Sequence, residues 1–83
     1  MEKRNHTELI VKVLAAVKKE GVTQDRFAAE IGLSDKAAIH IWKKNNYVPE
    51  RRRGAVAKHS RGTIEAEDFD PVYQRVHGRE NVL

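Results

Sequence analysis

Two short helical segments that flank the tripeptide Gly32-Leu33-Ser34 constrain this chain more than any other feature. Segments 24–31 and 34–45 each place apolar residues on one face at helical spacing. Gly32 accepts the positive φ of a tight turn, Leu33 anchors the turn on the core, and Ser34 is a good N-cap for the second segment. Two short helices joined in this way predict a helix-turn-helix, in which Ile39 and Trp42 hold the second helix against the first.

The remaining apolar pattern predicts further helices and no regular strand. Residues 7–20 form the clearest helix, with one apolar stripe and Gly21 as its stop. Pro49 suits the start of another helix that runs to about His59. Residues 65–69 fit a short fifth helix, and Thr63-Ile64 fits the start of a strand. Because β-branched residues after position 50 never alternate over strand length, we expect an all-α domain of four to five helices, with a short C-terminal β-hairpin as the alternative for the second half.

Length and composition fit one small domain. A chain of 83 residues has room for one core, and 40% hydrophobic residues are too many for a wholly disordered chain. We expect the domain to occupy residues 1–73 and residues 74–83 to form a flexible tail. The chain has no cysteine and no apolar stretch of membrane-spanning length. These two observations exclude a disulfide framework and a membrane-spanning helix.

The net charge of +4 is concentrated in the middle of the chain. Residues 43–61 hold seven Lys and Arg against Glu50 alone, a net of +6, whereas residues 62–70 carry four acidic residues and a net of −4. A basic run between ordered elements is more typical of a face that binds an anionic partner than of a solvated surface.

The sequence favours no enzyme chemistry. His6, His40, His59 and His77 lack metal-ligand spacing, and the chain has no phosphate-cradling glycine loop. Neither of its two serines lies in a pattern typical of a nucleophile. We therefore expect no catalytic residue, no metal, no cofactor and no small-molecule substrate.

Three stretches together resemble the Cro-like repressors of temperate phages and related prophage-type regulators. They are residues 24–34 leading to Trp42, residues 48–53, and residues 60–71. The third is similar to the family's closing pattern of a glycine turn, an apolar residue, an acidic stretch, an apolar residue and a proline. In one respect the chain departs from the family: Ile39 and Trp42 come seven and ten residues after Gly32, one more than the common spacing. One residue is thus inserted around positions 34–38.

The resemblance implies a lambda-repressor-like fold and a sequence-specific repressor that binds double-stranded DNA. It further implies a phage or prophage lysis–lysogeny regulator that works in the cytoplasm of a bacterial host cell. The alternative is a helix-turn-helix module that binds a partner protein, as an antitoxin does.

In a helix-turn-helix the second helix lies in the major groove, with its N-terminal residues at base edges. Since Ile39 and Trp42 face inward, the residues expected at base edges are Ser34, Asp35, Lys36, Ala37, His40 and Ile41. Ile41 lies between the two faces and fits the core equally well. Phosphate contacts are expected from Gln24, Lys43, Lys44, Asn45, Asn46, Tyr47, Arg51 and Arg52. Arg51, Arg52 and Arg53 cannot all face one way on a helix, so one or two of them are expected to be spectators or to pair with Glu residues.

A single small module reads too few base pairs to find one operator, so we expect a homodimer on palindromic DNA. Four apolar residues of the second half are available to join the protomers. We assign Val72 and Tyr73 to the dimer interface, and Ile64 and Phe69 to the core of the monomer.

Overall fold

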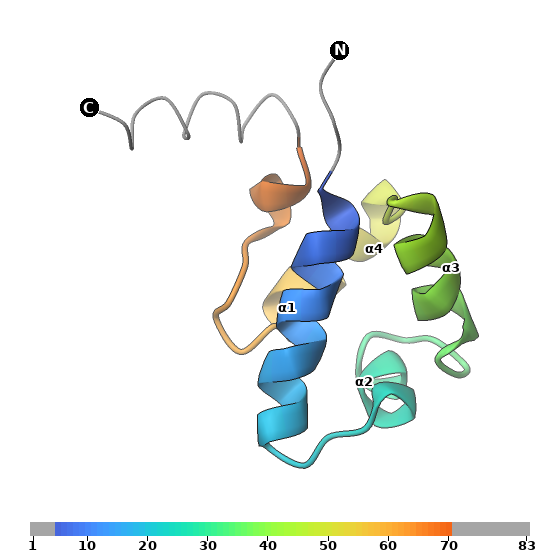
Figure 1. The fold of residues 1–83 in the computed structure, drawn as a ribbon, viewed down its shortest axis with the longest axis vertical. Helices are drawn as coiled ribbons and strands as arrows, with labels where there is room; N and C mark the ends of the chain where they lie inside the picture. The colour runs from blue at the N-terminus through green and yellow to red at the C-terminus, as the bar shows by residue number, and fades with distance from the viewer. Residues whose placement is uncertain (1–4, 71–83) are drawn as a thin grey trace.

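The computed structural model describes residues 5–70, which form four α-helices and one 3-10 turn. The elements are α1 (His6–Lys19), α2 (Gln24–Glu30), α3 (Ala37–Asn45), α4 (Glu50–Lys58) and the 3-10 helix η1 (Ala66–Phe69). In Figure 1, α1 runs through the middle of the fold, with α2 and α3 on one side and α4 passing behind it. No strand occurs within residues 5–70, so the all-α expectation is confirmed and the β-hairpin alternative is not found there.

The core is built around the apolar stripe of α1, against which α2, α3 and η1 pack. Val13 and Val17 are almost completely buried, as are Phe27 of α2 and Ile39 of α3. Trp42 is 7% exposed, in agreement with its expected inward position. Val48 and Val56 close the side next to α4, and Ile64 and Phe69 complete the core from the last turn. The assignment of Ile64 and Phe69 to the core of the monomer is therefore confirmed.

The connection between α2 and α3 differs from the sequence expectation at its second half. Gly32 has a φ of +86°, as its place in a tight turn requires, and Leu33 packs against the core. Ser34 was expected to cap the next helix, but α3 begins only at Ala37, so that expectation is wrong. Asp35 Oδ1 instead accepts from the Ala37 N–H at 2.8 Å, and Asp25 Oδ1 of α2 accepts from the Lys36 N–H at 3.1 Å. Two carboxylates therefore cap the start of α3 in place of the expected serine.

His6, at the start of α1, ties three distant parts of the chain together. Its side chain is 1% exposed. Nδ1 accepts from the Val48 N–H at 2.9 Å, so Nε2 carries the proton and donates to the Phe69 carbonyl. The ring also stacks on Tyr47 and meets Phe69 edge-on. His6 thus joins α1 to the segment before α4 and to η1.

Three sequence predictions lie outside the described residues. They are the domain boundary at residue 73, the tail over residues 74–83, and the dimer contacts of Val72 and Tyr73. Within residues 5–70, no helix combines the length and the apolar character that crossing a bilayer demands.

Candidate nucleic-acid interface

The outward face of α3 is the centre of the candidate interface. Ala37, His40, Ile41 and Lys44 recur at helical spacing and are all exposed, while Ile39 and Trp42 point into the core. Ile41 is 56% exposed. The sequence left Ile41 between core and surface, and the structure places it on the surface.

The residues ahead of α3 lie on the surface as well. Ser34, Asp35 and Lys36 are exposed. One carboxylate oxygen of Asp35 caps α3, so this side chain has a structural role at the helix start. All six residues predicted at base edges are therefore solvent-accessible in the structure.

Two of the residues predicted to contact phosphate, Gln24 and Lys43, meet at one cavity although they come from different helices. The cavity has a volume of about 560 Å³. It is lined by α1, by the start of α2 and by the last turn of α3. Its wall includes Val11, Leu14 and Lys18 of α1. Gln24 Oε1 is buried and has no hydrogen-bond partner among the described residues. Gln24 is thus less available at the surface than its position in the sequence suggests.

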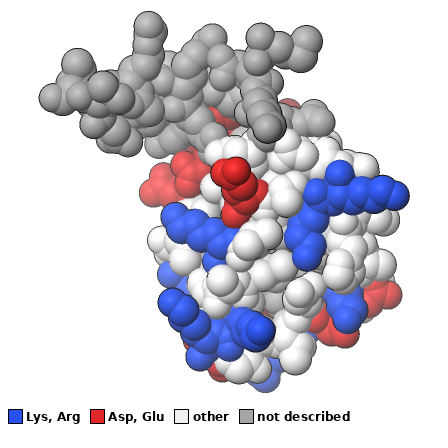
Figure 2. Space-filling model, in the orientation of Figure 1, with Lys and Arg blue, Asp and Glu red and all other residues white. Residues whose placement is uncertain are grey.

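Figure 2 shows Lys and Arg side chains on both sides of the molecule in the orientation of Figure 1, with largely uncharged surface and a few Asp and Glu side chains between them. Lys44, Asn45 and Arg51 are exposed, and no hydrogen bond or ion pair of their side chains is found with any described residue. They are accordingly the predicted phosphate contacts that the structure leaves most accessible.

Asn46, Tyr47 and Arg52 have structural contacts. Asn46 adopts a left-handed backbone, and its Oδ1 accepts from the Thr7 N–H at 2.9 Å, which caps α1. Tyr47 stacks on His6. Arg52 Nη1 donates to the Ile31 carbonyl at 3.4 Å, at the end of α2. These three residues hold elements together, whatever further contact they make.

Arg53 also turns inward. Its Nε donates to the Val48 carbonyl at 2.8 Å, its guanidinium lies 5.2 Å from the centre of the Tyr47 ring, and Nη1 lies 3.9 Å from Glu50. Arg51 is the exposed member of the arginine run. The expectation that the three arginines would face different ways is confirmed.

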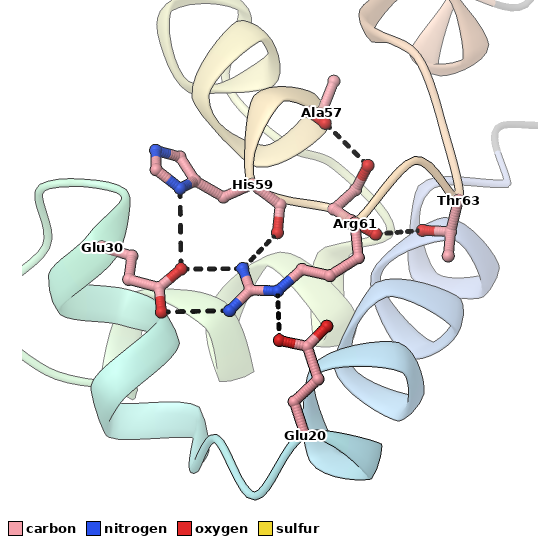
Figure 3. A network of polar contacts seen from close by, with 7 residues as sticks. Glu20, Glu30, Ala57, His59, Arg61 and Thr63 are labelled. Carbon is pink, nitrogen blue, oxygen red and sulfur yellow. Dashed lines mark hydrogen bonds and ion pairs between the residues drawn. The ribbon is translucent and has the colours of Figure 1, made fainter.

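The last cation of the basic stretch, Arg61, is also engaged within the fold (Figure 3). Its guanidinium donates to both carboxylate oxygens of Glu30, at 2.8 and 3.2 Å, and to Glu20 at 3.2 Å. The hydrogen bond with Glu30 raises the pKa of Arg61 above its ordinary value. The same bond holds the pKa of Glu30 below its ordinary value, although partial burial opposes the shift.

The basic stretch 43–61 is therefore not one continuous binding face. Three of its seven cations hold the fold together, namely Arg52, Arg53 and Arg61. Three lie at the surface, namely Lys44, Arg51 and Lys58, and the half-buried Lys43 lines the cavity. Sequence alone could not separate these groups, because the partners of Arg52 and Arg61 lie 21 to 41 residues away.

No family model matches this chain, and no curated protein or solved structure matches it either. The candidate interface consequently rests on its own geometry. Within residues 5–70, no group of three or more His, Asp or Glu side chains is arranged to hold a metal ion.

Proposed function

We propose that this chain is a sequence-specific repressor that binds double-stranded DNA, with α3 in the major groove. The observation that carries the proposal is the exposed face of α3, which contains no acidic residue and is bordered by Lys36 at its start and Lys44 at its end. An α-helix fits the major groove, and a helix free of carboxylates limits repulsion by the phosphates. The nearest carboxylates, Asp25 and Asp35, each accept a backbone N–H at the start of α3.

The surface cations supply the second part of the argument. Lys44 on α3 and Arg51 at the start of α4 are both exposed, so their side chains are available to phosphates beside the groove. Binding of the operator would exclude polymerase and needs no cofactor. The resemblance to Cro-like regulators suggests a role in phage or prophage lysis–lysogeny control.

Two protomers per operator complete the proposal. One module buries only about 600–1,000 Å² on DNA, which is too little to select one site in a genome. A dimer on a palindrome with half-sites about one helical turn apart doubles the sequence that is read. A stoichiometry measurement on a palindromic operator beside a half-site tests this step. Equal affinity per protomer on both would contradict it.

The central experiment is selection of bound duplexes from random DNA, followed by a footprint and a titration in rising salt. We expect one enriched motif, a protected site of matching length, and affinity that falls as salt rises. Salt-insensitive binding or the absence of an enriched motif would overturn the proposal. That outcome would favour the antitoxin-like alternative, in which the same surface binds a protein.

A further inference from the structure

Ile41 is an unusual residue to find at the centre of an exposed polar face. The side chain is 56% exposed on α3, and the fold would bury it only by rotating α3 away from Ile39 and Trp42. Its neighbours one turn away are Ala37 and Lys44, and both are exposed. The middle of the face is thus a small apolar spot, formed by a branched side chain next to a methyl group.

The surroundings of this spot indicate what covers it. His40 precedes Ile41, Lys44 lies one turn further along, Lys36 lies just ahead of the helix, and α3 itself has no carboxylate. A protein interface generally needs a cluster of large anchors, usually aromatic residues or arginine. Here one isoleucine and one alanine provide far less apolar surface. A small apolar spot on a helix that carries Lys44 one turn away and Lys36 just ahead of its start instead complements a phosphate-lined groove that exposes isolated methyl groups.

The major groove presents one apolar group, the 5-methyl of thymine. On this basis, which rests on the function proposed above, we propose that Ile41, supported by Ala37, reads thymine methyl groups and is a specificity-determining residue of this chain. Ala37 lies at the first position of α3 and is small, so the start of the helix can approach the base edges closely. Lys36 and His40 then supply the hydrogen bonds to neighbouring bases.

The test compares thymine with uracil in the selected operator, because uracil differs from thymine only by lacking the methyl group. Each thymine is replaced in turn, at the equivalent position of both half-sites, and the affinity of the full chain is measured by titration. Loss of one buried methyl is expected to weaken binding about fourfold. We expect this loss at one or two positions per half-site and no change at the others.

Two variants assign the effect to a residue. Ile41→Ala removes the contacting side chain without disturbing the core and is expected to bind the thymine and uracil operators equally. Ile41→Val, which keeps a branched side chain, should retain most of the discrimination. Lys44→Ala is the matched control on the same face. It should weaken binding to both operators and leave their ratio at the wild-type value.

The possible failures are distinguishable. Selective binding with no uracil-sensitive position would overturn the inference and leave the proposed function standing. Discrimination that persists in Ile41→Ala would assign the methyl contact to another residue and overturn it as well. A change of oligomeric state in Ile41→Ala would show that a protein surface covers this residue. Absence of any selected sequence would overturn the proposed function itself, before uracil is tested.

Discussion

At the residue scale, His6 combines two hydrogen bonds, two ring contacts and nearly complete burial in one side chain. Its neutral form satisfies both partners at once, since Nδ1 accepts and Nε2 donates. Replacing it by alanine leaves the Val48 N–H and the Phe69 carbonyl without these bonds and opens a cavity. We expect His6→Ala to lower the free energy of unfolding by about 2–4 kcal/mol.

Chemical denaturation measures this loss. The control is Val11→Ala, which removes an apolar side chain from the same helix at a position that is 52% exposed. That variant should change the free energy of unfolding by less than about 1 kcal/mol. Equal stability of the His6 variant and the wild type would mean that the three segments are held together by other contacts.

Individual cations of the basic stretch 43–61 are expected to differ in role, some contacting DNA and others stabilising the fold. Lys44 and Arg51 are exposed, whereas Arg61 is held by Glu30 and Glu20. We expect Lys44→Ala and Arg51→Ala each to reduce the salt dependence of DNA binding by about one phosphate contact, on every sequence alike. Affinity measured at a series of salt concentrations gives this slope. Arg61→Ala should keep the wild-type salt dependence and melt at a lower temperature. A reduced salt dependence with an unchanged melting temperature would show that Arg61 contacts DNA and does not stabilise the fold.

At the element scale, the start of α3 depends on two carboxylates, one of them eleven residues back on α2. Asp25 Oδ1 accepts from the Lys36 N–H, so α2 fixes the end of α3 that carries the residues predicted at base edges. Asp25→Ala removes this cap and should cost about 1 kcal/mol of stability. Asp25→Asn keeps an oxygen acceptor and should stay close to the wild type. Thermal melts compare the two, and equal losses in both variants would show that charge, not the hydrogen bond, stabilises this junction.

The helices themselves could be predicted from the sequence, whereas the contacts that join them could not. Apolar spacing, which is a local signal, predicted α1, α2 and α3, and Pro49 predicted the start of α4. The start of α3 was missed because its cap comes from a distant helix. His6 was missed for the same reason, since its partners lie 42 and 63 residues away. A signal did exist, because His6 continues the inward stripe of α1 by one turn ahead of Leu9 and Ile10.

At the scale of the whole molecule, Arg61 joins helices that are far from it in the sequence, since Glu20 and Glu30 lie 41 and 31 residues away. Its guanidinium connects the end of α1, through Glu20, with the end of α2, through Glu30, and its own backbone follows α4 with a left-handed φ of +58° (Figure 3). The ion pairs are partly exposed, so each contributes modestly. Their place matters more than their strength, because they hold the helix pair that presents α3 against the rest of the fold.

This junction predicts how stability depends on pH. Arg61 holds the pKa of Glu30 below the ordinary value of 4.5, and His59 and Arg26 also face this carboxylate and favour its charged form. A group whose pKa is lower in the folded state stabilises fully above its unfolded pKa, and the contribution disappears as pH falls through the folded value. Glu30→Gln should therefore be less stable than the wild type by about 1 kcal/mol at pH 7, with the exposure of the pair taken into account. Denaturation at successive pH values should show this gap closing once the pH drops below about 4.5. A gap that stayed constant from pH 7 to pH 3 would mean that Glu30 acts through packing and not through its charge.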